Sequence, residues 1–181
     1  MNNIELDFFN TNTLTVAKSI LGHSLFFKKN NKLIGGVINE VEAYVQEDQA
    51  SHSYKGQTKR NSPMFSSPGT IYIYQIYGLY HCLNITTEQE GRGCAILIRS
   101  LIPTNNIEII KKNRKKRTQL TNGPAKLVQG LNIPTNLNGT LINTNNLFIS
   151  KEKIKPKKII RSSRIGITKN QNKKWRFYFN C

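Results

Sequence analysis

The chain has 181 residues, inside the usual size range of one compact domain, so we expect a single domain over residues 1–181. Lysine and arginine together number 27 against 10 acidic residues, and the formal net charge is +17. An excess of this size indicates a polyanionic partner. A hydrophobic content of 38% and an aromatic content of 9% exclude a disordered basic tail, which is poorer in such residues.

The sequence lacks the patterns of membrane and secreted proteins. It contains no run of about 18 apolar residues, which a membrane span would need, and residues 1–10 lack the basic and apolar blocks of a signal peptide. Cys82, Cys94 and Cys181 have no CxxC spacing, which suits free thiols in a reducing compartment better than disulfides or zinc ligands. We therefore expect a cytoplasmic protein with no metal site and no membrane partner.

A first amphipathic helix is predicted within residues 11–22. Apolar side chains recur there at helical spacing, threonines precede them as candidate caps, and Gly22 follows as a stop signal. Residues 23–29 and 32–44 indicate two strands around the turn KNNK. Because side chains alternate between the two faces of a strand, the second strand places three side chains on one face: Glu40, Glu42 and Tyr44.

The middle of the chain combines a long polar loop with two aromatic strands. Residues 45–68 are polar and contain the turn signal SSPG, and long loops in compact domains are often functional. Residues 69–77 and 79–87 are rich in β-branched and aromatic residues and meet at Gly78, which predicts neighbouring strands joined by a tight bend. Tyr77 is expected at the tip of that bend.

The second half of the chain predicts a further strand and one or two helices. Residues 94–102 read as a largely buried strand whose one charge is Arg99. Residues 107–117 indicate a short helix or a basic loop, and residues 122–131 indicate a helix with Asn122 near its cap and a proline in its first turn. Short strands with lysine-rich connections complete the chain. The whole pattern predicts a mixed α+β fold.

Glu42 is the first candidate for chemistry, because it is flanked by apolar residues in a chain with few carboxylates. A carboxylate held against a water molecule removes its proton as the water attacks, which is general-base catalysis worth about 100-fold or more. Arg99 could orient both the carboxylate and the water. The simpler alternative is an ion pair between Glu42 and a lysine or arginine at the end of a strand.

Several aromatic side chains are expected to converge: Tyr44, His52, Tyr72, Tyr74 and Tyr77. A nucleobase taken out of a duplex is held by aromatic faces and a few polar contacts, and an electron-rich face also attracts a cationic, alkylated purine. The side chain at the tip of the predicted bend is placed to fill the gap left in the base stack. Ordinary packing between strands explains Tyr72 and Tyr80 equally well.

The basic residues are candidates for salt-sensitive contacts with DNA phosphates, in particular Lys59, Arg60, Lys126 and the run from Lys111 to Arg117. Charge alone fits a non-catalytic nucleic-acid-binding protein just as well, and for any single lysine a solvated side chain is the better explanation. A zinc nucleobase deaminase is excluded, because the chain lacks the HxE and PCxxC elements of those enzymes.

An ordered series of motifs resembles the alkyladenine (methylpurine, 3-methyladenine) DNA glycosylase family. The most specific are EVEAY and PGTIYIYQIYGLYHCLNI, and the others are SHS, TKRN, MF, ILIR, NGPAKLVQGL, RIGI and WRFY. The resemblance implies a single domain with a curved, mostly antiparallel and open-barrel-like sheet, flanking helices and no cofactor. It also implies an enzyme that excises alkylated or deaminated purines from double-stranded DNA and leaves an abasic site without cutting the strand. We further expect a monomer, which would suit a protein that scans DNA.

The same resemblance assigns roles to individual residues. Glu42 would be the general base, and Arg99 and the backbone carbonyl of Ile165 would hold the attacking water. The base pocket would be lined by Tyr44, His52, Tyr74 and Asn84, with Asn84 hindering the extra amino group of guanine. Tyr77 would be the intercalating wedge, and the DNA backbone would be bound by Lys59, Arg60 and Lys126.

Overall fold

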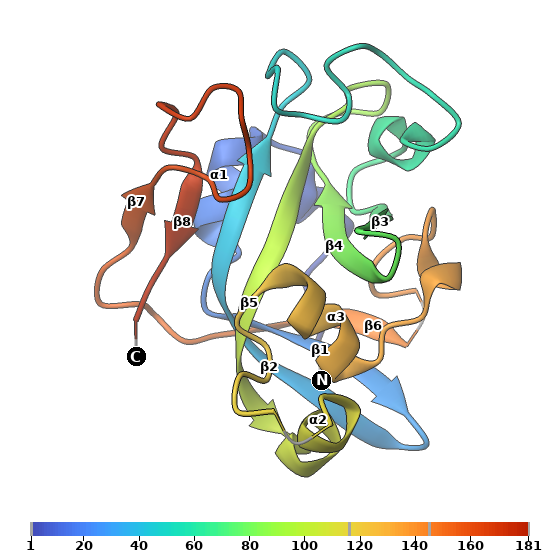
Figure 1. Cartoon of the computed structure of the whole chain (residues 1–181), viewed down its shortest axis with the longest axis vertical. Helices are drawn as coiled ribbons and strands as arrows, with labels where there is room; N and C mark the ends of the chain where they lie inside the picture. Colours follow the sequence, from blue (N-terminus) through green and yellow to red (C-terminus); the bar gives the residue numbers. More distant parts are fainter. Residues whose placement is uncertain (1, 116, 145, 181) are drawn as a thin grey trace.

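The computed structural model describes residues 2–115, 117–144 and 146–180 and shows a mixed α+β fold, as expected from the sequence (Figure 1). Its centre is an eight-stranded sheet in which strands are ordered β3-β4-β5-β2-β1-β6, with β8 also paired to β2 and β7 paired to β8. Every strand pairing among the described residues is antiparallel. The path ends at β3 and β6 without closing, so the sheet is open.

The elements have the following bounds. The α-helices are α1 (Thr13–Ser19), α2 (Ile107–Asn113) and α3 (Pro124–Leu131), and short 3-10 helices cover Leu6–Phe9, Ser62–Phe65 and Thr135–Leu137. The strands are β1 (His23–Lys29), β2 (Lys32–Tyr44), β3 (Ile71–Ile76), β4 (Tyr80–Thr86), β5 (Ala95–Asn105), β6 (Leu147–Lys153), β7 (Ile160–Ser162) and β8 (Arg176–Tyr178).

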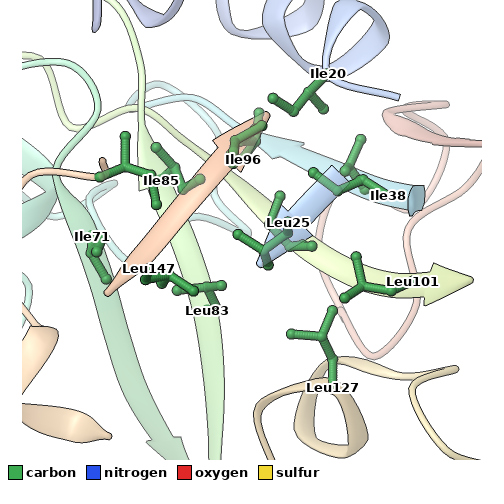
Figure 2. Close-up of a cluster of buried hydrophobic side chains, with 14 of the residues drawn as sticks. Ile20, Leu25, Ile38, Ile71, Leu83, Ile85, Ile96, Leu101, Leu127 and Leu147 are labelled. Atoms are coloured by element: carbon green, nitrogen blue, oxygen red, sulfur yellow. The ribbon is translucent and has the colours of Figure 1, made fainter. Parts of the chain in front are cut away.

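A hydrophobic core joins the sheet to its helices. Side chains from β1 to β6 and from β8 meet in one cluster, which Ile20 at the end of α1 and Leu127 of α3 also enter (Figure 2). Both of these side chains are fully buried. Because burying apolar surface is the main favourable term in folding, this cluster holds α1 and α3 against the central strands.

Local signals predicted the elements well and their caps less well. The first helix is capped by Asn12, whose side chain accepts from the N–H groups of Leu14 and Thr15, and not by a threonine. The helix predicted from residue 122 begins at Pro124 with Gly123 as its N-cap, so Asn122 lies next to the cap and the proline is in the first turn, as expected. Of the basic segment, residues 107–113 are helical, and Lys116 lies outside the described residues.

The pairing of β2 with β5 is irregular at the positions that matter for the site. Glu40 pairs with Ser100, whereas Val41 pairs with Ile98, so Arg99 is an extra residue on β5. Such a bulge bends the strand and redirects a side chain, and bulges are common next to active sites. Here the bulge turns Arg99 toward β2.

A close approach of β2 to β5 gives a test of the fold. A Cβ atom on Gly36 would lie 2.8 Å from both the carbonyl carbon of Ile102 and the Cα of Pro103. Gly36→Ala should therefore lower the free energy of unfolding by about 3 kcal/mol or more, because backbone must move to relieve the overlap. Gly139→Ala is the control, since its side chain would meet open space and cost only the strain of a positive φ, about 1–2 kcal/mol. Urea denaturation of both variants measures the difference, and equal losses would contradict the proposed overlap.

Candidate active site

A pocket of about 530 Å³ opens between the aromatic strands and three other segments. Its walls come from β3 and β4, from residues 49–52 after β2, from the start of α3 and from residues 165–169. Residues proposed from the sequence for the base pocket all line it: Tyr44, His52, Tyr74 and Asn84. Arg99, Ile165, Lys126 and Tyr77 line the same pocket, so the fold gathers side chains that are up to 121 residues apart in sequence, from Tyr44 to Ile165.

Glu42 lies directly behind this pocket. Its side chain is fully buried, and each group that contacts it belongs to a residue of the pocket wall. The Tyr44 hydroxyl donates to Oε2 at 2.8 Å, and Arg99 Nη1 lies 3.3 Å from the same oxygen. The backbone N–H of Ile165 donates to Oε1 at 2.7 Å. These contacts leave Glu42 held from three sides.

The structure adds a second carboxylate that sequence reasoning had placed only on the same strand face. Glu40 Oε1 accepts from Arg99 Nε at 2.7 Å and from Arg176 Nε of β8 at 2.6 Å. Burial alone would lower the pKa of Arg99, but Glu42 and Glu40 outweigh it and the pKa is raised. Arg99 is therefore a charged bridge between two carboxylates. The signal in the sequence was the pair of carboxylates two residues apart in an acid-poor chain.

The aromatic wall is built from side chains of β3 and the loop before it. The rings of His52 and Tyr74 meet edge to face, with centroids 4.5 Å apart. Nδ1 of His52 lies 3.0 Å from the hydroxyl of Tyr72. Tyr72 is only 1% exposed and packs in a hydrophobic cluster, and it also lines the pocket. Packing between strands and a place in the pocket therefore both hold for this residue. The amide of Asn84 donates to the carbonyl of Tyr72 at 3.1 Å, which orients it beside this wall.

Tyr77 stands at the tip of the β3–β4 hairpin, as predicted. Its side chain is 88% exposed, and it adopts a positive φ of 48° followed by Gly78 at 67°. Leu79 next to it is 77% exposed. Tyr80 is 41% exposed and pairs with Ile76 across the hairpin, so it lies outside the core. The hairpin thus presents a large aromatic ring to solvent beside the mouth of the pocket.

The candidate phosphate-binding residues lie at different distances from the pocket. Lys126 is in the first turn of α3 and lines the pocket, where its ammonium donates to the side chain of Gln119. Lys59 and Arg60 are exposed and outside the pocket, although Arg60 donates to the carbonyl of Gln75 near the hairpin tip. The described part of the run Lys111–Arg117 borders a separate groove at the end of α2.

The described ranges hold neither a metal cluster nor a membrane-spanning helix. Within them, no group of three or more His, Cys, Asp or Glu side chains is arranged to hold a metal ion. Over the same ranges, no helix has the length and apolar character needed to cross a bilayer.

The chain is similar to one protein family and to several named proteins. The family described as "Methylpurine-DNA glycosylase (MPG)" matches residues 7–181. A protein of Francisella tularensis named "Putative 3-methyladenine DNA glycosylase" is 42% identical over 184 residues, which cover 98% of this chain and 95% of the relative. Proteins with the same name from Chlorobium phaeobacteroides (42% identity, 95% and 89% covered) and Carboxydothermus hydrogenoformans (43% identity, 94% and 92% covered) are similar. The chain therefore belongs to the methylpurine-DNA glycosylase family.

Proposed function

We propose that this protein is a DNA-repair glycosylase that turns a methylated or deaminated purine out of duplex DNA and hydrolyses its N-glycosidic bond with a water activated by Glu42. The observation that supports this most directly is a fully buried carboxylate behind an aromatic pocket of about 530 Å³. A pocket of this size suits a small planar ligand. Membership of the family and the printed names of the relatives point the same way.

In this proposal Glu42 is the general base. A carboxylate oxygen has room for two hydrogen bonds, so Oε1, whose protein donor is the N–H of Ile165, keeps acceptor capacity for a water. The attacking water binds there, next to Arg99, with the carbonyl of Ile165 as a further acceptor. Since water and not a lysine amine attacks the sugar, the product is an abasic site in an uncut strand.

The aromatic wall would recognise the extruded base. Tyr44, His52 and Tyr74 offer ring faces and edges to a purine, and their electron-rich surfaces favour a positively charged, alkylated one. Asn84, fixed by its bond to Tyr72, would crowd the exocyclic amino group of normal guanine. Damaged bases also cost less to extrude from the stack.

DNA binding in this proposal combines a wedge with phosphate contacts. Tyr77 enters the duplex and fills the gap left by the extruded base, while Lys59, Arg60 and Lys126 contact the backbone. The formal charge of +17 supports a sequence-independent attraction to DNA. We further propose that the enzyme works as a monomer in the cytoplasm.

Replacement of the proposed base tests the reaction. Glu42→Gln should reduce single-turnover release of purine by about 100-fold or more, because the amide cannot accept a proton from water. Binding to the same duplex should persist. The measurement is base release from hypoxanthine-containing oligonucleotides and from methylated genomic DNA at fixed moderate salt. Glu5→Gln, which makes the same change at an exposed site, is the control.

The rival to this proposal is a basic DNA-binding protein without activity. For such a protein, Glu42→Gln would leave DNA binding unchanged and there would be no release to lose. If folded wild-type protein releases no purine from either DNA, the enzymatic proposal is wrong.

The wedge is tested separately. Stacking of a base on an aromatic side chain is worth about 1–3 kcal/mol, so Tyr77→Ala should weaken extrusion by about 5- to 150-fold. Fluorescence of 2-aminopurine placed beside the lesion reports the extruded population, and single-turnover release should fall in parallel. Ile154→Ala, which also removes an exposed apolar side chain, should change neither signal. Unchanged fluorescence in the Tyr77 variant would argue against intercalation.

The ionisation of His52 gives a further test. Burial and the nearby charge of Arg60 lower the pKa of His52 below 6.5, so the ring facing the base is neutral at pH 7. Because the folded-state pKa is depressed, protonation of His52 costs stability as pH falls from 6.5 through that pKa. Arg60→Gln should raise the pKa of His52 toward 6.5 in an NMR titration. The pKa of His23, lowered by burial and Lys153, should not move; a wild-type pKa of His52 above 6.5 would contradict the assignment.

A further inference from the structure

A buried ion pair joins two of the loops that line the pocket. Arg164 Nη1 contacts Asp48 Oδ2, and both side chains are fully buried. Asp48 precedes the pocket residues 49–52, and Arg164 precedes the pocket residues 165–169. Asn170 donates to the other oxygen of Asp48 at 2.5 Å, so this carboxylate holds the second loop at both of its ends.

Arg164 also binds the strand that carries the proposed base. Its Nη1 donates to the carbonyl of Ala43 at 2.9 Å, and its guanidinium lies over the ring of Tyr44, 4.6 Å from the centroid. These contacts tie two neighbouring residues of β2 to two neighbouring residues of the last loop. Arg164 binds the carbonyl of Ala43, and the next residue, Ile165, donates its N–H to Glu42 at 2.7 Å.

Stability alone gives no reason for this ion pair. Among the described residues, Nε and Nη2 of Arg164 have no hydrogen-bond partner and are buried; the guanidinium instead lies over two rings, those of Tyr44 and Trp175. Replacing a buried ion pair by apolar residues of similar volume is often neutral or stabilising, whereas removing one partner is costly. The position of the Asp48–Arg164 pair in the pocket wall is better explained by the way it holds the two loops relative to β2.

We propose that Arg164, held by Asp48, is a positioning residue for the hydrolysis proposed above: it fixes the main chain of Ile165 against Glu42. The proposal rests on the proposed function and adds a residue that touches neither the base nor the water. Without Arg164 the loop would be free to move the Ile165 N–H and carbonyl away from the carboxylate. A misplacement of about 1 Å in an active site can cost about 100-fold in rate.

The double variant Arg164→Met with Asp48→Leu separates positioning from folding. The double variant should unfold at a higher temperature than either single variant, because no uncompensated charge remains buried. Single-turnover purine release at saturating DNA should fall by about 100-fold, while the DNA concentration for half-maximal rate changes by less than about threefold. The same substitutions at the exposed pair Arg92 and Glu47 form the matched control, since that pair also joins two loops but does not touch Glu42. They should leave both quantities unchanged.

A conservative variant guards against a double variant that fails to fold. Arg164→Lys keeps the charge for Asp48 but lacks the planar fork that also reaches the Ala43 carbonyl. Its rate at saturation should fall by about tenfold at unchanged half-saturation. A rate within about twofold of wild type in this variant, or in a folded double variant, overturns the positioning role.

The two proposals fail in distinguishable ways. If the wild-type protein releases no purine, the proposed function is wrong, whatever the variants do. If the wild-type protein is active and the Arg164 variants are equally active, only the positioning role is wrong. A parallel rise in half-saturating DNA and fall in rate would place Arg164 in DNA binding, and would also overturn the inference.

Discussion

The carboxylate of Glu42 imposes the strictest requirement on this fold. Taking a carboxylate out of water costs several kcal/mol unless donors and charges replace the lost hydration. Three groups supply that replacement: the hydroxyl of Tyr44 on the same strand, the guanidinium of Arg99 on β5, and the N–H of Ile165 in the last loop. The strand pairing, the bulge and the path of the last loop must all be correct at once for Glu42 to be buried.

The arginines around this carboxylate form a layered network. Arg99 leaves β5 at a bulge and bridges Glu42 and Glu40, and Arg176 of β8 reaches the same oxygen of Glu40. The short β8 therefore belongs to the site although it contributes no residue to the pocket wall. In the proposed mechanism, this network keeps Arg99 beside the water without letting its charge turn toward DNA phosphates.

Charge is distributed in a way that fits the proposed function. The chain has only 10 acidic residues, and the buried or largely buried ones, Glu40, Glu42, Asp48 and Glu88, are each paired with an arginine. Their negative charge is neutralised within the fold, so it does little to oppose an approaching polyanion. The exposed lysines and arginines remain to attract DNA over a range that salt limits.

Sequence alone was sufficient for the α+β class, the aromatic hairpin with Tyr77 at its tip and several side chains that line the pocket, because these follow from short-range periodicity and from recognisable motifs. It was not sufficient for the cap at Asn12, the bulge at Arg99, the bridging role of Glu40 or the pairing of Asp48 with Arg164. Asp48 and Arg164 are 116 residues apart, and nothing local distinguishes them from solvated charges. Their burial depends on where two loops meet, and only the tertiary structure decides that, because desolvation and ion pairing act between segments that the fold brings together.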